Sequence, residues 1–224
     1  TPSVTVSASG IRFLGLPDVM VGTVVLTTEF RTFFGGSGAE HFADLAVDKA
    51  GNTYMIGETT STDFPLSNAL QPRYDGGFSD LVVVKLLCDG RSLGFSTYLG
   101  GSGRDAVRVK FTAGYPISYV KEPEASVVFS NDESRFVFFA QTCSQDFPVR
   151  SPVFQDSMRT DTSGVVVLVS SEGELMKSAY LGGAGTCYIN FIDKDAADYI
   201  YLAGDFAFDT LWFITENVIQ PTMP

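Results

Sequence analysis

Short runs of apolar residues, separated by turn residues, recur along this chain. Residues 44–48 and 53–57 alternate between apolar and polar, and residues 81–87 form a continuous run of β-branched character. Asp89-Gly90 then precedes a further run, residues 93–99. Runs of this length bounded by Gly, Asn and Asp predict β-strands, and an Asp-Gly pair predicts a tight hairpin. The pattern therefore predicts four short antiparallel strands in a row.

The same order of elements returns further along the chain. The phrase Phe-x-Thr-(Phe/Tyr)-(Phe/Leu)-Gly-Gly-Ser-Gly occurs at residues 30–38 and 95–103, and a relative of it occupies 177–185. Asp-Phe-Pro also occurs twice, and we expect its Phe64 and Phe147 to be buried between neighbouring sheets. One β-rich phrase repeated at such intervals indicates copies of a single supersecondary unit. The sequence therefore predicts an all-β fold, a β-propeller or part of one, with four-stranded antiparallel blades.

A single propeller-type domain, residues 1–224, is expected from this repeat. It divides into a partial blade at 1–38, a blade at 39–103, a blade with an insertion at 104–185 and a partial blade at 186–224. The first partial blade is typical of a third and a fourth strand, and the last is typical of a first and a second. Halves that complement each other in this way suit closure of a ring without an exposed edge.

The number of blades requires an explanation, because about three blades are too few for the usual closed ring of four to eight. The chain is part of a larger propeller, or residues 5–16 supply two more strands of a compact four-bladed ring, or another chain completes the ring. We favour a fragment or a chain completed by another piece. The expected partner is accordingly a protein partner or additional blades from another chain.

Several motifs stand in a fixed order through the best-formed blade. They are Ala-Val-Asp-Lys-Ala-Gly-Asn-Thr-Tyr (46–54), Ser-Thr-Asp-Phe-Pro (61–65), Gln-Pro (71–72), Asp-Leu-Val-Val-Val-Lys (80–85) and Tyr-Leu-Gly-Gly-Ser-Gly (98–103). In this order they resemble the SBBP family, the seven-bladed β-propeller repeat of large, mainly bacterial surface and secreted proteins. The resemblance implies a propeller and an extracellular or cell-surface location, and it brings no catalytic residues with it.

Charge and composition exclude some classes of partner. Asp and Glu number 26 against 15 Lys and Arg, for a net charge of −11. An acidic chain is a poor ligand for nucleic acid or for anionic membrane surfaces. The chain contains no run of 18 apolar residues, so no transmembrane helix is predicted. Neither a nucleic-acid partner nor membrane insertion is therefore expected. The three cysteines lack Cys-x-x-Cys spacing and are expected to be buried free thiols.

Catalysis has little support in the sequence. The only histidine, His41, is expected in a loop, and a Ser-His-Asp triad would depend entirely on it. Paired carboxylates are the remaining enzymatic route, with Asp44, Asp48, Asp105 and Asp193 as candidates. Aspartate at such positions is also expected to cap turns by accepting backbone N–H groups. No catalytic residue is assigned, and the chain is expected not to be an enzyme.

A weak calcium candidate lies in the last partial blade. Asp193, Asp195 and Asp198 provide oxygen donors at alternating positions, as a Ca²⁺ loop does, but the Gly and the terminal Glu of a twelve-residue loop are missing. The same residues also suit a hairpin turn that needs no ion. No other cofactor is expected.

The second blade contains 17 more residues than the first, and the extra residues fall between Ala106 and Glu124. Alternation within this stretch predicts an added hairpin or an ordered loop. Its tyrosines stand beside charged residues, a composition typical of contact surfaces. The predicted partner-binding residues are Tyr115, Tyr119, Lys121 and Glu122. A passive insertion is the alternative, because the entropy of loop closure grows slowly with length.

Together these features favour a non-catalytic scaffold or protein-interaction module in a larger surface, secreted or multi-subunit assembly. Two alternatives remain: a carbohydrate-binding or carbohydrate-cleaving propeller, and a structural spacer of an adhesin or filament.

Overall fold

The computed structural model describes residues 3–6, 24–27, 32–107, 127–182 and 187–206, and these residues contain strands, turns and loops but no helix. The all-β prediction is therefore confirmed. The described residues accordingly include no helix able to cross a membrane. The chain separates into two units, Thr1–Phe33 and Phe34–Pro224.

The first unit contains one pair of strands. β1 (Ser3–Val6) pairs antiparallel with β2 (Val24–Thr27). The sequence predicts a third and a fourth strand at residues 22–27 and 30–34 of the first partial blade. β2 lies in the first of these stretches, but it pairs with β1. Residues 32–34 form no strand.

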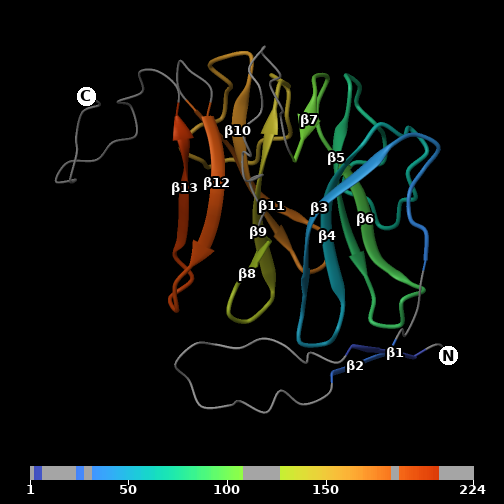
Figure 1. The fold of residues 1–224 in the computed structure, drawn as a ribbon. Coiled ribbons are helices and arrows are strands. Elements are labelled where there is room, and N and C mark those ends of the chain that lie inside the picture. The colour runs from blue at the N-terminus through green and yellow to red at the C-terminus, as the bar shows by residue number, and fades with distance from the viewer. Residues whose placement is uncertain (1–2, 7–23, 28–31, 108–126, 183–186, 207–224) are drawn as a thin grey trace, which may run out of the picture. The chain divides into compact units, whose positions relative to one another are not determined.

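The second unit opens with a four-stranded antiparallel sheet, which we call the first blade (Figure 1). Its strands follow one another in chain order, each beside the next. They are β3 (Glu40–Val47), β4 (Thr53–Thr59), β5 (Asp80–Leu86) and β6 (Leu93–Leu99). The prediction for β6 matches its observed bounds, whereas β3 begins four residues earlier than expected. His41 consequently lies in a strand, where it is exposed, and not in a loop.

The second blade has the same order, but its first strand is divided. β7 (Asp105–Ala106) and β8 (Val128–Phe129) both pair with β9 (Arg135–Thr142), β7 at its end and β8 near its beginning. β10 (Ser163–Ser170) and β11 (Leu175–Leu181) complete the sheet. The predicted insertion therefore interrupts the first strand instead of preceding it. In the first blade, the register of β3 shifts between Phe42 and Asp44, the corresponding point.

A third sheet has two strands in the described part of the chain. They are β12 (Cys187–Lys194) and β13 (Ile200–Phe206). The sequence predicts strands at residues 188–193 and 199–204, within two residues of these bounds.

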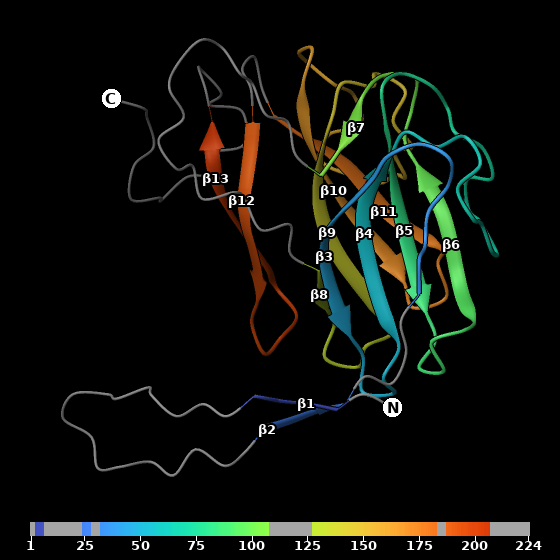
Figure 2. The ribbon, with the colours of Figure 1, turned by 45° about the vertical axis from the view of Figure 1, so that its right-hand side comes forward.

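The main core lies between the first and second blades, which pack against each other (Figure 2). Aromatic rings dominate this core: Tyr54 and Phe95 from the first blade contact Phe136 from the second, with ring centroids 5.2 and 6.5 Å apart. All three side chains are buried. Burial of large aromatic side chains is a strong source of stability, so this interface joins the two blades firmly.

The Asp-Phe-Pro motif is structural, as predicted. Phe64 and Phe147 are each only 3% exposed. The backbone N–H of Phe64 donates to the Tyr98 hydroxyl at 2.9 Å, and Phe147 repeats this contact with Tyr180 at 3.1 Å. Phe147 belongs to the core between the two blades, whereas Phe64 packs on the opposite face of the first blade.

The Gly-Gly-Ser-Gly phrase joins each blade to the chain before it. Ser37 donates from its backbone N–H and its hydroxyl to Asp63 Oδ1, at 2.8 and 3.0 Å. Ser102 makes the same two contacts with Asp146, at the same distances. The repeated phrase therefore marks the point at which the chain docks on the next blade.

Candidate functional site

Three equivalent turns connect the first and second strands of the three sheets. We call them the first turn (48–52), the second turn (130–135) and the third turn (195–199). In each one, the N–H of the fourth residue donates to the carbonyl of the first: Gly51 to Asp48, Glu133 to Ser130 and Asp198 to Asp195, at 2.9, 2.9 and 3.1 Å. The repeat thus continues into the turns, although their sequences differ.

The fourth residue of every turn has a positive φ. The values are 84° for Gly51, 56° for Glu133 and 63° for Asp198. Glycine adopts this conformation at no steric cost, whereas other residues adopt it only at a cost in free energy. The second and third turns therefore hold an acidic residue where glycine would fit better, and its side chain must offset that cost.

The acidic side chains connect neighbouring turns. Glu133 Oε2 accepts a hydrogen bond from the backbone N–H of Lys49 at 3.0 Å, and its Oε1 lies 3.3 Å from the Lys49 ammonium. Asp198 Oδ1 accepts from the backbone N–H of Asn131 at 3.0 Å. Lys49 and Asn131 are both the second residue of their turns. Each acidic residue therefore holds the turn of the preceding blade, and we call this pair of contacts the carboxylate relay.

The third turn is also held by cations. Lys194 Nζ lies 2.8 Å from Asp198 Oδ1, and Arg135 lies 4.0 Å from its other carboxylate oxygen. The hydrogen bond from Lys194 holds the pKa of Asp198 below its usual range. The side-chain amide of Asn131 donates to the Ala196 carbonyl at 2.8 Å. These contacts fix the third turn against the second.

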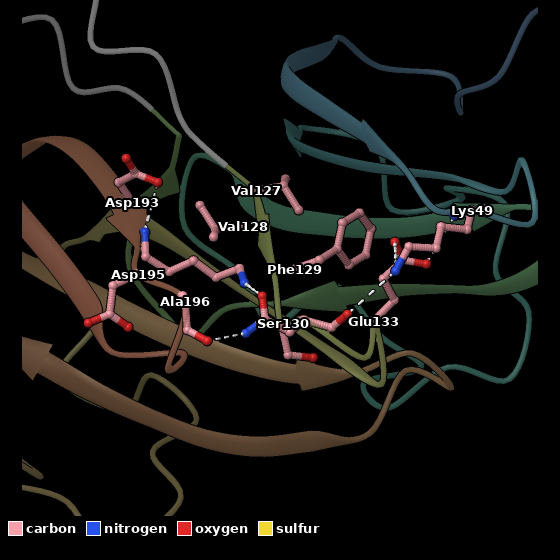
Figure 3. Close-up of a pocket in the computed structure, with 11 residues that line it drawn as sticks. Lys49, Val127, Val128, Phe129, Ser130, Glu133, Asp193, Asp195 and Ala196 are labelled. Atoms are coloured by element: carbon pink, nitrogen blue, oxygen red, sulfur yellow. Dashed lines mark hydrogen bonds and ion pairs between the residues drawn. The ribbon is translucent and has the colours of Figure 1, made fainter.

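An open hollow of about 580 Å³ lies among the three turns (Figure 3). Lys49 and Glu133 stand at one end of it, and Asp193, Asp195 and Ala196 stand at the other. Three residues around β8 provide apolar lining: Val127, Val128 and Phe129. The hollow therefore combines apolar side chains with a rim that carries both signs of charge.

The inserted segment returns to the fold at this hollow. Val127, the first described residue after it, lines the hollow and donates its backbone N–H to Asp44 Oδ2 at 2.7 Å. The predicted contact residues Tyr115, Tyr119, Lys121 and Glu122 themselves lie outside the described residues. The structure thus places the end of the insertion, but not these four side chains.

The calcium candidates lie around the third turn, and each carboxylate accepts hydrogen bonds there. Asp193 accepts from the N–H of Lys194 at 2.8 Å. Asp195 accepts from Ala197 and Tyr199, and the contact with Tyr199 contributes most to its lowered pKa. Within the described ranges, no three His, Cys, Asp or Glu side chains are grouped so as to hold a metal ion.

The other carboxylate candidates also serve as caps. Asp48 accepts a hydrogen bond from the backbone N–H of Asn52 at 2.8 Å. Asp44 accepts hydrogen bonds from the backbone N–H groups of Leu45 and Val127. Asp105 is fully buried, away from the hollow, and accepts from Gly101 and Ser144, each at 2.8 Å, and from Thr142. Of the four carboxylate candidates, only Asp193 lines the hollow.

The cysteines only partly follow the expectation. Cys88 and Cys143 are free thiols, but Cys88 is exposed and Cys143 is half-buried. Cys88 lies in the β5–β6 hairpin turn. The prediction of buried thiols is therefore wrong for Cys88.

The two blades enclose a buried acidic pair, of which sequence reasoning named Asp105 as a candidate but missed Asp80. Asp80 and Asp105 are both fully buried. A Cβ on Gly100 would lie 2.8 Å from Asp80 Oδ1 and 2.7 Å from Asp105 Oδ2, so both carboxyls border this glycine. Asp80 Oδ1 accepts no hydrogen bond. Burial raises the pKa of Asp80 to about 7 and also raises the pKa of Asp105.

The matched family model covers the start of the second unit. Residues 32–65 match the SBBP model, described as a beta-propeller repeat. These residues form an SBBP repeat. A comparison with curated proteins found no match. The SBBP match spans the Gly-Gly-Ser-Gly phrase, β3, the first turn, β4 and the Asp-Phe-Pro motif. Residues 32–65 thus match a beta-propeller repeat, and the described residues form a four-stranded blade, a second blade with a divided first strand and a two-stranded third sheet.

The carboxylate relay predicts losses of different size for two substitutions of Glu133. Glu133→Ala removes the contacts with Lys49 and keeps a non-glycine residue at positive φ, so we expect a loss of roughly 1–2 kcal/mol in the free energy of unfolding. Glu133→Gly removes the same contacts but also relieves the backbone, so its loss should be smaller by about 1 kcal/mol. Urea denaturation of both variants measures the difference. Equal losses would show that the backbone conformation at Glu133 carries no cost.

Proposed function

We propose that this chain is a non-catalytic β-propeller module that binds a protein partner at the hollow and through the inserted segment. We further propose that it acts at the cell surface or outside the cell, within a larger assembly. The observation that carries the proposal is the placement of the hollow, which lies where three turns meet and where the insertion returns at Val127. Loops held by a rigid frame are the usual positions of binding residues.

The chemistry of the hollow supports a protein ligand. Phe129 and two valines provide apolar lining, and Lys49, Asp193 and Asp195 offer charges of both signs. An apolar centre with a polar rim is the general anatomy of protein–protein interfaces. The carboxylate relay holds this arrangement in place, which reduces the entropy that binding must otherwise cost.

One observation favours the carbohydrate alternative. Phe129, Glu133, Asp193 and Asp195 line the same hollow, and an aromatic ring with nearby carboxylates can also contact a sugar. A panel of immobilised glycans therefore belongs in the test.

The proposal predicts that filling the hollow abolishes binding. Ala196 lines the hollow and is exposed, whereas its exposed neighbour Ala197 does not line it. Ala196→Arg should lower the retention of partner proteins from extracts of the source organism at least tenfold, and Ala197→Arg should leave it unchanged. Replacement of residues 108–124 by a short Gly-Ser link, which leaves the buried Val107 in place, should have the same effect as Ala196→Arg.

Other outcomes point to the alternatives. Retention of a glycan that Ala196→Arg abolishes would favour the carbohydrate-binding propeller. Unchanged protein retention by both folded variants would overturn the proposal and leave the spacer, which needs no preferred contact surface. Circular dichroism and urea midpoints of each variant establish that the fold is intact.

A further inference from the structure

Each lysine that lines the hollow already has an acidic partner. Lys49 Nζ lies 3.3 Å from Glu133, and Lys194 Nζ lies 2.8 Å from Asp198. Both ammonium groups also donate to Asn131, that of Lys49 to its backbone carbonyl and that of Lys194 to its side-chain oxygen. The cations of the hollow are therefore engaged within the protein, which makes an anionic ligand a poor fit.

Two carboxylates at the hollow have no such partner. Within the described ranges, no Lys, Arg or His lies within ion-pair distance of Asp193 or Asp195. Asp193 is exposed, and the backbone N–H of Lys194 donates only to its Oδ1. A hydrogen bond from the backbone N–H of Tyr199 holds the pKa of Asp195 below its usual range. The uncompensated charge is therefore negative, and both groups that carry it stand at one end of the hollow (Figure 3).

The middle of the hollow offers an aromatic ring in a fixed position. Phe129 is half-buried, and its ring packs edge-on against Tyr54 and Phe136, with centroids 4.9 and 6.1 Å apart. Two valines lie beside it in the lining (Figure 3). The same cluster of rings already receives a cation elsewhere, because the Lys85 ammonium lies 5.2 Å from the centroid of the Tyr54 ring. The hollow thus joins a rigid apolar surface to an acidic end.

We propose that the partner segment bound in the hollow carries a basic side chain, arginine above all, which pairs with Asp193 and Asp195 while an apolar neighbour in the segment packs on Phe129. This inference rests on the proposed function and names the chemistry of the partner at the same site. A guanidinium group has five donors in one plane, so it can reach carboxylate oxygens while its aliphatic stem lies on apolar surface. Complementary charge of this kind selects one partner over others.

The same features separate this partner from other ligands. A phosphate or an acidic glycan would meet the uncompensated carboxylates and be repelled. A neutral glycan would leave both carboxylates without a cation, and a purely apolar segment would do the same. A basic side chain next to an apolar one uses both parts of the hollow.

Selection from a library of random peptides tests the inference before any partner is identified. Phage that display short random peptides are selected on the immobilised full-length chain and then compared on two variants. Ala196→Trp fills the hollow without adding charge, and Ala197→Trp changes an exposed neighbour that does not line it. Peptides lost on Ala196→Trp but retained on Ala197→Trp bind at the hollow. We expect this set to be enriched in Arg or Lys next to an apolar residue.

Asp193→Asn then tests the charge. The variant keeps a side-chain oxygen for the Lys194 N–H, so its circular dichroism and urea midpoint should match those of the native chain. It should lower the affinity for a selected Arg peptide by about tenfold, measured by fluorescence anisotropy, because a charge-assisted hydrogen bond is lost. Affinity for the same peptide with Gln in place of Arg should not change. Asp156→Asn is the matched control, since Asp156 is exposed, does not line the hollow and carries the same charge.

The possible failures have different meanings. Hollow-binding peptides that lack a basic residue would overturn the inference, and so would equal weakening by Asp193→Asn and Asp156→Asn. Either result leaves the proposed function standing, because the hollow would still bind a protein segment. If Ala196→Trp released no selected peptide, the hollow would bind no such segment, and the inference and the proposed function would both fail.

Discussion

Gly173→Ala is expected to lower the free energy of unfolding by roughly 2–5 kcal/mol, the largest single-residue effect we predict. Gly173 has a φ of 90° and lies in the β10–β11 hairpin of the second blade. A Cβ there would lie 2.6 Å from the ring of Phe95, which belongs to the first blade and is fully buried. The ring cannot move aside, because it packs against Phe136 in the core between the blades.

Gly51→Ala is a closely matched control for this substitution. Gly51 has a φ of 84°, nearly that of Gly173, but its Cβ would approach only the Cys88 side chain, at 3.3 Å. Gly51→Ala should therefore lower the free energy of unfolding by the backbone cost alone, about 1–2 kcal/mol, with little steric conflict. Urea denaturation of both variants separates the two terms. Equal losses would mean that the contact between Gly173 and Phe95 does not limit the packing of the blades.

Asp80→Asn is expected to stabilise the protein at and above neutral pH and to have little effect near pH 4. The pKa of Asp80 is about 7 in the folded protein, because burial disfavours the charged carboxylate, against 3.8 for an ordinary Asp. Between these values the folded state binds the extra proton, so the stability of the native protein falls as the pH rises from about 4 to about 7. At 1.36 kcal/mol for each pKa unit, the variant should gain up to about 4 kcal/mol above pH 7.

The measurement is the difference in unfolding free energy between Asp80→Asn and the native protein from pH 4 to pH 8. The difference between the two proteins reports the titration of Asp80 together with its coulombic coupling to Asp105, which also raises the pKa of Asp80. Asp89→Asn should have the opposite sign, because the Ser92 hydroxyl and two backbone N–H groups hold the pKa of Asp89 below its usual range. If Asp80→Asn shifted stability by the same amount at every pH, Asp80 would not be the buried titrating group.

The repeat carries most of what could be predicted from the sequence. β6 was predicted with its observed bounds, since it lies between the Asp-Gly turn signal and a Gly-Gly phrase. The burial of Phe64 and Phe147 followed from the recurrence of Asp-Phe-Pro. These features are local, and a local pattern is sufficient to place them.

Features that depend on distant contacts could not be predicted in this way. Glu133 stands where the first turn has a glycine, and the sequence alone shows only a departure from the repeat. The structure shows that the Glu133 side chain binds Lys49, 84 residues earlier. Asp80 stands at the end of a polar loop and nothing in its local sequence indicates burial, yet it is fully buried. The divided first strand was missed because β7 is only two residues long, too short for a periodic signal. In each case the deciding neighbour belongs to another blade or to another strand.

The divided first strand has a consequence for protein engineering. β7 and β8 each pair with β9, so both ends of the interrupting segment are anchored on one strand of an otherwise complete blade. Doubling the length of such a segment costs only about 0.6 kcal/mol in closure entropy. The interval between Val107 and Val127 is therefore a natural grafting position, at which an epitope or a binding peptide can be displayed with both ends fixed and the propeller sheets left unaltered.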